Sequence, residues 1–136
     1  MEKPAESVEN YLETILMLGY NRAIVRSVDI ANELGFSKPS ISVAMKNLKA
    51  SGYIEIIAGG QITLTKSGRE IAQRIYDRHT LISDLLIFLG VDHDTAVRDA
   101  CKMEHGMSEE SFIALQGHLK DLKQKMYMRK RPEENA

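Results

Sequence analysis

Residues 26–65 constrain the possible fold more than any other part of the chain. A short helical pattern, Val28–Leu34, ends at Gly35, and Ser37 precedes a longer helical pattern that ends at Gly52. Glycine suits the left-handed conformation that often follows a helix, and a serine hydroxyl can accept a hydrogen bond from the first turn of the next helix. The pattern predicts two helices joined by a tight turn, either a helix-turn-helix or an ordinary helical hairpin.

The residues after Gly52 favour the helix-turn-helix. Two runs rich in β-branched residues, Tyr53–Ile57 and Gln61–Thr65, flank the turn Ala58–Gly60. Such runs around a glycine pair predict a two-stranded antiparallel hairpin. A hairpin directly after a helix-turn-helix is the wing of a winged helix-turn-helix, and this combination is much more specific than either part. We therefore predict that this part of the chain binds double-stranded DNA.

The side chains expected to contact DNA are mostly small hydroxyls and cations. Small hydroxyls let the N-terminus of the second helix come close to phosphates, and a neighbouring lysine adds charge. Gln61 lies near the tip of the hairpin, within reach of a minor groove or of the DNA backbone. The predicted DNA-binding residues are Arg26, Ser37, Lys38, Pro39, Ser40, Ser42, Lys46 and Gln61.

Charge is divided unevenly along the chain, although the net charge of the 136 residues is only −1. Residues 21–53 carry five Lys or Arg against two Asp or Glu, a net +3, whereas residues 77–112 carry three against eight, a net −5. Charged runs are usually solvated faces. A basic first half and an acidic second half nevertheless suggest one surface for a polyanion and another for a cation.

Helical periodicity accounts for the rest of the chain. Apolar residues at helical spacing predict a helix over residues 6–19, a long helix from about residue 66 to Leu89, a helix that ends near Glu104 and a last helix that opens at Ser108. In the long helix the apolar residues up to Leu89 mark the buried side. We therefore predict a mainly α fold with an N-terminal winged helix-turn-helix, whose wing has two strands, followed by a helical region.

A group of possible metal ligands lies near the end of the third of these helices. Cys101, Glu104 and His105 stand at positions i, i+3 and i+4, so a helix would present all three side chains on one face. A thiol, a carboxylate and an imidazole in that arrangement could close on a divalent metal ion. The alternative is a buried cysteine beside a surface Glu–His pair.

Two other places could supply ligands. His79 lies on the inner stripe of the long helix, where a histidine is either a satisfied core residue or a ligand. Asn10 and Glu13 are three residues apart on the first helix and point the same way. They are either a solvated edge or a pair of oxygen ligands.

Composition and simple sequence patterns argue against several other classes of protein. A single cysteine excludes an internal disulfide framework and fits a reducing cytoplasm. No apolar run approaches the length of a membrane span, and the start of the chain lacks the pattern of a secretory signal. A metalloenzyme is the weaker interpretation because no HExxH or comparable catalytic pattern occurs, and we expect no enzymatic activity.

Taken together, these features resemble a known family, the metal-dependent transcriptional repressors typified by the diphtheria toxin repressor and the manganese transport regulator. The resemblance covers nearly the whole chain. Its most specific segments are Glu9–Ile15, Ser37–Ser42, Leu64–Arg69, Arg78-His79 and Ala100–His105.

The family implies an N-terminal winged helix and a C-terminal helical dimerisation region, with metal bound between the two. It also implies that the metal-loaded homodimer binds an operator in the cytoplasm and represses metal-uptake genes, with no role for a membrane. On this basis we expect a winged helix-turn-helix domain over residues 1–72, metal-binding and dimerisation helices over residues 73–125, and a flexible tail over residues 126–136. The SH3-like domain of the toxin-repressor branch is expected to be absent.

Carried over to this sequence, the family's ligands form one metal position at Asn10, Cys101, Glu104 and His105, and a second at Glu13, His79 and Glu104. One or two ions per subunit are therefore expected. Asn10 offers a neutral carbonyl oxygen where the family usually has Met or Asp, and Cys101 follows the iron branch whereas Glu13 follows the manganese branch. Because a thiolate favours Fe(II), Co(II) or Zn(II) over Mn(II), we expect Fe(II), with Mn(II), Zn(II) and Co(II) as alternatives.

Two alternatives stay open, and the first is a winged helix used only for protein contacts. In the second, a winged-helix regulator could sense a small organic ligand, or the redox state of the cell through Cys101. Substitution of Glu104 distinguishes a thiol switch from a metal switch, because a thiol switch should survive the change and a metal switch should not.

Overall fold

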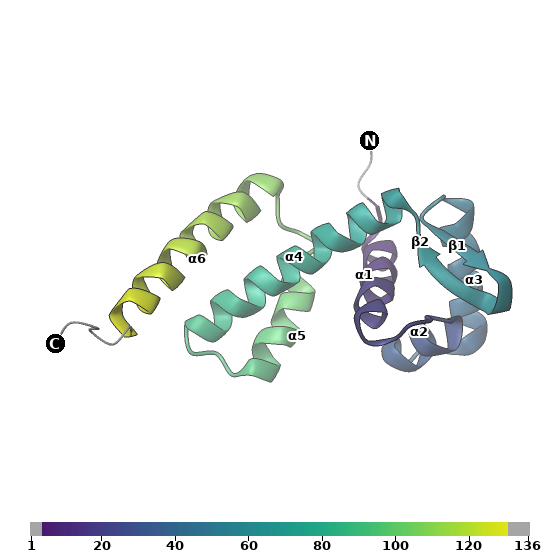
Figure 1. The fold of residues 1–136 in the computed structure, drawn as a ribbon, viewed down its shortest axis with the longest axis horizontal. Coiled ribbons are helices and arrows are strands. Elements are labelled where there is room, and N and C mark those ends of the chain that lie inside the picture. The colour runs from purple at the N-terminus through teal and green to yellow at the C-terminus, as the bar shows by residue number, and fades with distance from the viewer. Residues whose placement is uncertain (1–3, 131–136) are drawn as a thin grey trace. The chain divides into compact units, whose positions relative to one another are not determined.

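The computed structural model (Figure 1) describes residues 4–130, and the side chains of residues 4–125. Within that range no helix is both long and apolar enough to cross a membrane. In chain order the elements are α1 (Glu6–Asn21), α2 (Ser27–Leu34), α3 (Lys38–Ala50), β1 (Ile54–Ile57), the short 3-10 turn η1 (Ala58–Gly60), β2 (Gln61–Leu64), α4 (Lys66–Phe88), α5 (His93–Met103) and α6 (Glu109–Lys130).

The chain divides into two compact units, one ending at Tyr76 and the other beginning at Asp77. The division lies four residues beyond the one expected between residues 72 and 73. It falls inside the continuous helix α4, where the sequence has no glycine, proline or change of periodicity to mark it.

The first unit, which also includes the start of α4, is built around the apolar faces of α1, α2, α3 and the hairpin. One residue from each of these elements is fully buried, at 0–1% exposed: Leu12 in α1, Ile30 in α2, Ile41 in α3 and Ile54 in β1. All four belong to one core cluster. This shared core fixes α3 to the rest of the unit by its inner face and leaves its outer face in solvent.

The turn between α2 and α3 has the predicted helix-turn-helix geometry. Gly35 follows α2 with φ of 70°, a left-handed conformation that favours glycine. The hydroxyl of Ser37 accepts a hydrogen bond from the backbone N–H of Ser40 at 3.3 Å and so caps α3. The prediction of a helix-turn-helix is confirmed.

The predicted wing is also confirmed. Strands β1 and β2 pair in antiparallel register, with Ile54 opposite Leu64 and Ile57 opposite Gln61. Each strand is one residue shorter than expected, at the end away from the turn. The backbone N–H of Ile62 donates to the carbonyl of Val25 at 2.8 Å, which ties β2 to the segment before α2. The hairpin is therefore anchored on the helix-turn-helix.

The second unit contains the rest of α4 together with α5 and α6. Its core cluster contains Leu81 of α4 and Phe112 and Leu119 of α6. The prediction that Leu89 is buried is wrong: α4 ends at Phe88, and Leu89 is 68% exposed. The helix α6 runs to Lys130, so helix covers the first five residues of the segment expected to be a flexible tail, and residues 131–136 lie outside the described part.

Candidate metal centre and DNA-binding surface

The helix α5 ends within one residue of the expected position, but His105 lies outside it. The helix ends at Met103, Glu104 is its C-terminal cap, and His105 lies in the turn that follows. Cys101 is exposed, whereas the side chains of Glu104 and His105 are buried. The expected single helical face with all three side chains is therefore wrong for His105, because the chain leaves the helix before reaching it.

Tertiary packing brings a different histidine to the thiol. The Nδ1 atom of His79, in α4, lies 3.6 Å from the Cys101 sulfur and 2.9 Å from Oε2 of Glu104. The possible ligand atoms of His79, Cys101 and Glu104 all lie within 4.8 Å of one another. An imidazole, a thiol and a carboxylate at this spacing fit a divalent first-row metal ion such as Fe(II), Co(II) or Zn(II).

The electrostatics of this cluster favour a positive charge at its centre. Hydrogen bonding to the Cys101 sulfur, and secondarily to the Glu104 carboxylate, raises the pKa of His79 to about 10 against the opposing effect of partial burial. In the metal-free protein a proton on His79 supplies that charge at neutral pH. A metal ion that binds through Nδ1 must displace this proton.

His105 lies on the other side of the Glu104 carboxylate. Its Nε2 atom is 3.4 Å from Oε1 of Glu104, and both side chains are almost completely buried, at 5% and 0% exposed. The two oxygens of Glu104 thus face different imidazoles, His79 through Oε2 and His105 through Oε1. A carboxylate with this arrangement can serve two neighbouring ligand positions.

Arg78 holds the turn that carries Glu104 and His105. Only 5% of this residue is exposed, and its Nη1 atom donates to the backbone carbonyls of Glu104, at 3.5 Å, and Met107. Nη2 donates to the Glu109 carboxylate at 3.1 Å, and the guanidinium lies 5.7 Å from the ring centroid of Phe112. Arg78 therefore fixes the backbone of the ligand-bearing turn against α4 and the start of α6.

The two remaining predicted ligands, Asn10 and Glu13, belong to α1 in the first unit. Glu13 is 7% exposed, and Asn10 is half-buried with its backbone carbonyl accepting a hydrogen bond from the Thr14 hydroxyl at 2.8 Å. Nearby, the fully buried carboxylate of Glu9 is 3.1 Å from Nη2 of Arg74, which neutralises its charge. Glu13 is thus a second buried acid on α1 and not part of a solvated edge.

The predicted DNA-binding residues of the helix-turn-helix share an exposed surface. Every one of them, from Ser37 to Lys46, is exposed at the start of α3 or on its outer face. The Ser37 hydroxyl also donates to the Ser40 hydroxyl at 2.8 Å, so these two side chains are partly engaged within the protein. Val43 and Asn47 share the exposed face and were missed by the sequence analysis, although their spacing from Pro39 could have shown it.

The two predicted DNA-binding residues near the wing are placed differently. Arg26 is exposed, but its Nε atom donates to the carbonyl of Gly59 at 2.9 Å and its backbone N–H donates to the Asp29 carboxylate at 2.9 Å. Arg26 therefore ties the wing turn to the start of α2 as well as carrying charge. Gln61 is half-buried and pairs with Ile57 at the base of the wing turn.

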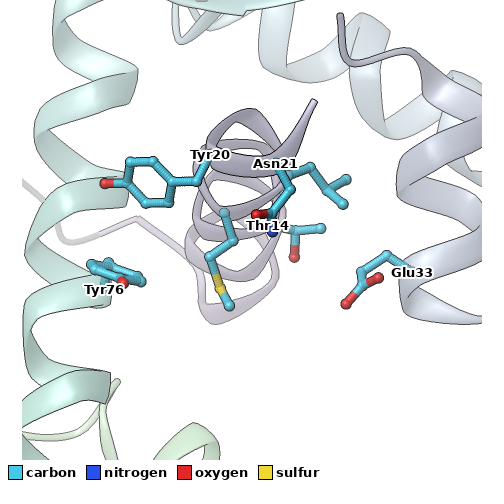
Figure 2. A pocket seen from close by; sticks show the side chains of 7 residues that line it. Thr14, Tyr20, Asn21, Glu33 and Tyr76 are labelled. Atoms are coloured by element: carbon cyan, nitrogen blue, oxygen red, sulfur yellow. The ribbon is translucent and has the colours of Figure 1, made fainter. Parts of the chain in front are cut away.

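A separate groove of about 550 Å³ opens in the first unit beside α1 and α2. Figure 2 shows Tyr20 and Tyr76 on one side of it and Glu33 on the other, and the two tyrosine ring centroids are 5.6 Å apart. Its size is that of a small-molecule site. None of the predicted metal-ligating or DNA-binding residues lines this groove. The lining residues are Thr14, Met17, Leu18, Tyr20, Asn21, Glu33 and Tyr76.

A winged helix-turn-helix and a helical unit with a His–Cys–Glu cluster define the class of metal-dependent transcriptional regulators, and comparisons with known proteins identify the family. The N-terminal DNA-binding domain of iron-dependent repressors matches residues 4–57, and their metal-binding and dimerisation domain matches residues 65–133. The chain belongs to the iron-dependent repressor family.

Individual relatives agree with this assignment. The transcriptional regulator MntR of Escherichia coli is 38% identical over 109 residues, which cover 80% of this chain and 70% of that protein. An uncharacterised helix-turn-helix regulator of Methanocaldococcus jannaschii, MJ0568, is 34% identical over 90% of this chain and 99% of its own length. Both are described as transcriptional regulators.

A solved structure, described as a manganese-dependent transcriptional repressor in complex with manganese, superposes with a TM-score of 0.75 at 26% identity. The match covers 83% of this chain. The chain spans about half the length of that structure, at 52%.

Proposed function

We propose that the protein is a homodimeric repressor whose binding to operator DNA is activated by Fe(II), with Mn(II) as the second candidate, and that it controls metal-uptake genes. The observation that carries the proposal is the cluster of His79, Cys101 and Glu104 in a chain that also exposes the outer face of a helix-turn-helix. Because its target is chromosomal DNA, we place the protein in the cytoplasm.

The choice of metal rests on the thiol. Cys101 is exposed and its sulfur lies beside the His79 ring, so a sulfur ligand is available at the cluster. A thiolate with an imidazole favours Fe(II), Co(II) or Zn(II), whereas Mn(II) prefers oxygen donors. Solved structures described as a manganese-dependent repressor and a manganese regulator keep Mn(II) as the alternative.

The proposed ligand set extends beyond the cluster. His105 faces the second oxygen of Glu104, which supports a second ion that shares this carboxylate and gives two ions per subunit at full occupancy. Asn10 and Glu13 join the set on the strength of the family resemblance. Their coordination would restrict the orientations open to the winged helix-turn-helix, so that the DNA-competent population of the dimer rises.

Dimerisation is proposed from the exposed apolar side chains of the second unit. Leu89 and Ile113 are 68% and 58% exposed, and Ile87 and Met103 are exposed as well. The matching family domain is described as a dimerisation domain. Contact with a second copy of the chain would remove these side chains from water, which stabilises association by roughly 25 cal/mol per Å² of apolar surface.

The test is DNA affinity as a function of metal. DNA duplexes would first be enriched from a random-sequence library by the full chain. Their affinity for the protein would then be measured anaerobically with chelator, Fe(II), Mn(II) or Zn(II), at one salt concentration because phosphate contacts depend on salt. We expect binding at least about tenfold tighter with Fe(II) than with chelator, the lower range of allosteric coupling. Equal affinity in both states would overturn the proposal, and tighter binding with Mn(II) than with Fe(II) would overturn the choice of metal.

Glu104→Gln tests whether the cluster carries the response. The variant keeps the shape of the side chain but removes the charge between His79 and His105, so we expect the metal dependence of DNA binding to be lost. Glu110→Gln, an exposed position at the start of α6, is the matched control and should keep it.

The alternative is a regulator that senses a small organic ligand or the redox state through Cys101. The groove beside Tyr20 and Tyr76 supports an organic ligand, and the exposure of Cys101 supports oxidation. Either would leave the metal titration without effect. Of the two, only a redox switch would change its DNA affinity in response to peroxide in the Glu104→Gln variant.

A further inference from the structure

The outer face of α3 carries one large apolar side chain at its centre. Val43 is 60% exposed and does not belong to the core cluster of the first unit. Pro39 lies four residues before it and Asn47 four residues after it, and both are also exposed, so Val43 is in the middle of the exposed stripe. Single exposed valines are common on protein surfaces, and it is this position that distinguishes Val43.

The surroundings of Val43 are those of a surface for DNA. Between Leu34 and Ile54 the chain has three lysines and no acidic residue. Phe36, the other large exposed apolar residue between Leu34 and Ile54, lies in the turn and packs edge-on against Tyr11, with ring centroids 6.4 Å apart. Phe36 thus has a partner within the protein, whereas Val43 projects from the basic face.

The chemistry of the major groove identifies what an aliphatic side chain can recognise there. Base edges present hydrogen-bond donors and acceptors to the groove, and their one apolar group is the C5-methyl group of thymine. Valine has no polar side-chain atom, so it cannot read the donors and acceptors. It can exclude water from a methyl group, and its branched shape restricts its rotamers so that little entropy is lost on contact.

We propose that Val43 is a specificity-determining residue of this protein, which selects thymine at one operator position by packing its γ-methyl groups on the thymine methyl. The inference rests on the proposed DNA-binding function and adds a named base to it. Ser40, Ser42 and Lys46 around it bind phosphates or polar base edges, so Val43 supplies the apolar part of the recognition.

The experiment removes the methyl group from the DNA and the side chain from the protein. Duplexes enriched from a random 24-base-pair library by the metal-loaded full chain would be remade with deoxyuridine in place of each thymine in turn. Wild type and Val43→Ala would be titrated at constant salt. We expect one position where deoxyuridine weakens wild-type binding about fourfold, the effect of leaving one methyl group in water, and weakens Val43→Ala by less than about twofold.

The control variant is Ile24→Ala, which truncates another exposed β-branched residue of the first unit that is not on α3. It should keep the full deoxyuridine effect. Two outcomes overturn the proposal while leaving DNA binding intact: no thymine position is sensitive to deoxyuridine, or the sensitivity is the same in Val43→Ala. Failure of wild type to bind any duplex with metal overturns the proposed function itself.

Discussion

At the scale of single residues, Arg78 and Glu109 form an ion pair whose two members have very different surroundings. The guanidinium side chain is 6% exposed and serves two backbone carbonyls, whereas the Glu109 side chain is 61% exposed. Water therefore screens the carboxylate and can replace its partner, while the carbonyls of Glu104 and Met107 have no comparable substitute. Loss of Arg78 should therefore lower the stability of the protein more than loss of Glu109.

This asymmetry gives a prediction for stability. Arg78→Met should lower the free energy of unfolding by about 2–4 kcal/mol, because buried carbonyl groups lose their donor. Glu109→Gln should lower it by less than about 1 kcal/mol, the usual value of an exposed ion pair. Urea denaturation of the metal-free full chain measures both, and equal losses would contradict the assignment.

The raised pKa of His79 predicts opposite pH dependences for the metal-free and the loaded protein. Its pKa in the folded metal-free state is about 10 against 6.5 in the unfolded chain, so its contribution to stability is complete below pH 6.5 and is lost as pH rises towards 10. A bound ion needs the deprotonated ring, so metal affinity rises over the same range.

The measurement is the thermal midpoint with and without metal between pH 6 and 9. We expect the difference between the two midpoints to widen as pH rises. A difference that is independent of pH, at equal free metal concentration, would show that binding displaces no proton from His79.

Only part of the candidate metal centre was predictable at this scale. The sequence identified Cys101 and Glu104 from their helical spacing and offered His79 as a core residue or a ligand, and the family resemblance placed His79 with Glu104. It paired the thiol with His105, four residues away, whereas His79 is the imidazole in contact with the sulfur, 22 residues away. Local spacing cannot report which side chains meet when α4 packs against α5.

At the scale of elements, the junction of the wing with α4 depends on a glycine. A Cβ atom at Gly68 would lie 2.0 Å from the backbone carbonyl oxygen of Tyr53, a contact that cannot be relieved without moving the backbone. Gly117 in α6 is the opposite case, since a Cβ atom there meets nothing within 4 Å. The two positions are a matched pair of helical glycines.

We expect alanine to change the thermal midpoint in opposite directions at these two positions. Gly68→Ala should destabilise the protein by about 3 kcal/mol or more, because the start of α4 is forced away from the hairpin. Gly117→Ala should stabilise it by about 0.5–1 kcal/mol, the difference in helix propensity. Calorimetry decides this, and a neutral Gly68→Ala would mean that the two elements are not in close contact.

Helix boundaries were predictable where a cap or a glycine marks them. Gly35 and Ser37 bound the turn of the helix-turn-helix as expected, and Asp92 caps α5 by accepting from the backbone N–H of Asp94. The end of α5 was predicted to within one residue, but the place of His105 outside the helix, two residues beyond Met103, was not. That position is fixed by hydrogen bonds from Arg78, a residue of another helix.

At the scale of the whole molecule, the proposed dimer makes Leu89 a sensitive position. Leu89→Glu places a charge on an exposed apolar residue of the second unit and should convert a dimer into monomers. Operator affinity should then fall by about 100-fold, because two linked DNA-binding units lose their avidity. Sedimentation velocity and anisotropy measure the two effects, with Ile24→Glu in the first unit as the control. A dimer that survives Leu89→Glu would place the interface elsewhere.

The sequence by itself determined the order of the elements, the winged helix-turn-helix and the family, because periodicity, caps and turn residues act over a few neighbouring positions. Tertiary structure alone decided which imidazole meets the thiol and which side chains of α3 and α4 stay in water. It also decided where within α4 one unit gives way to the next. These properties depend on contacts between residues far apart in the chain, and burial and electrostatics at such contacts leave no local pattern.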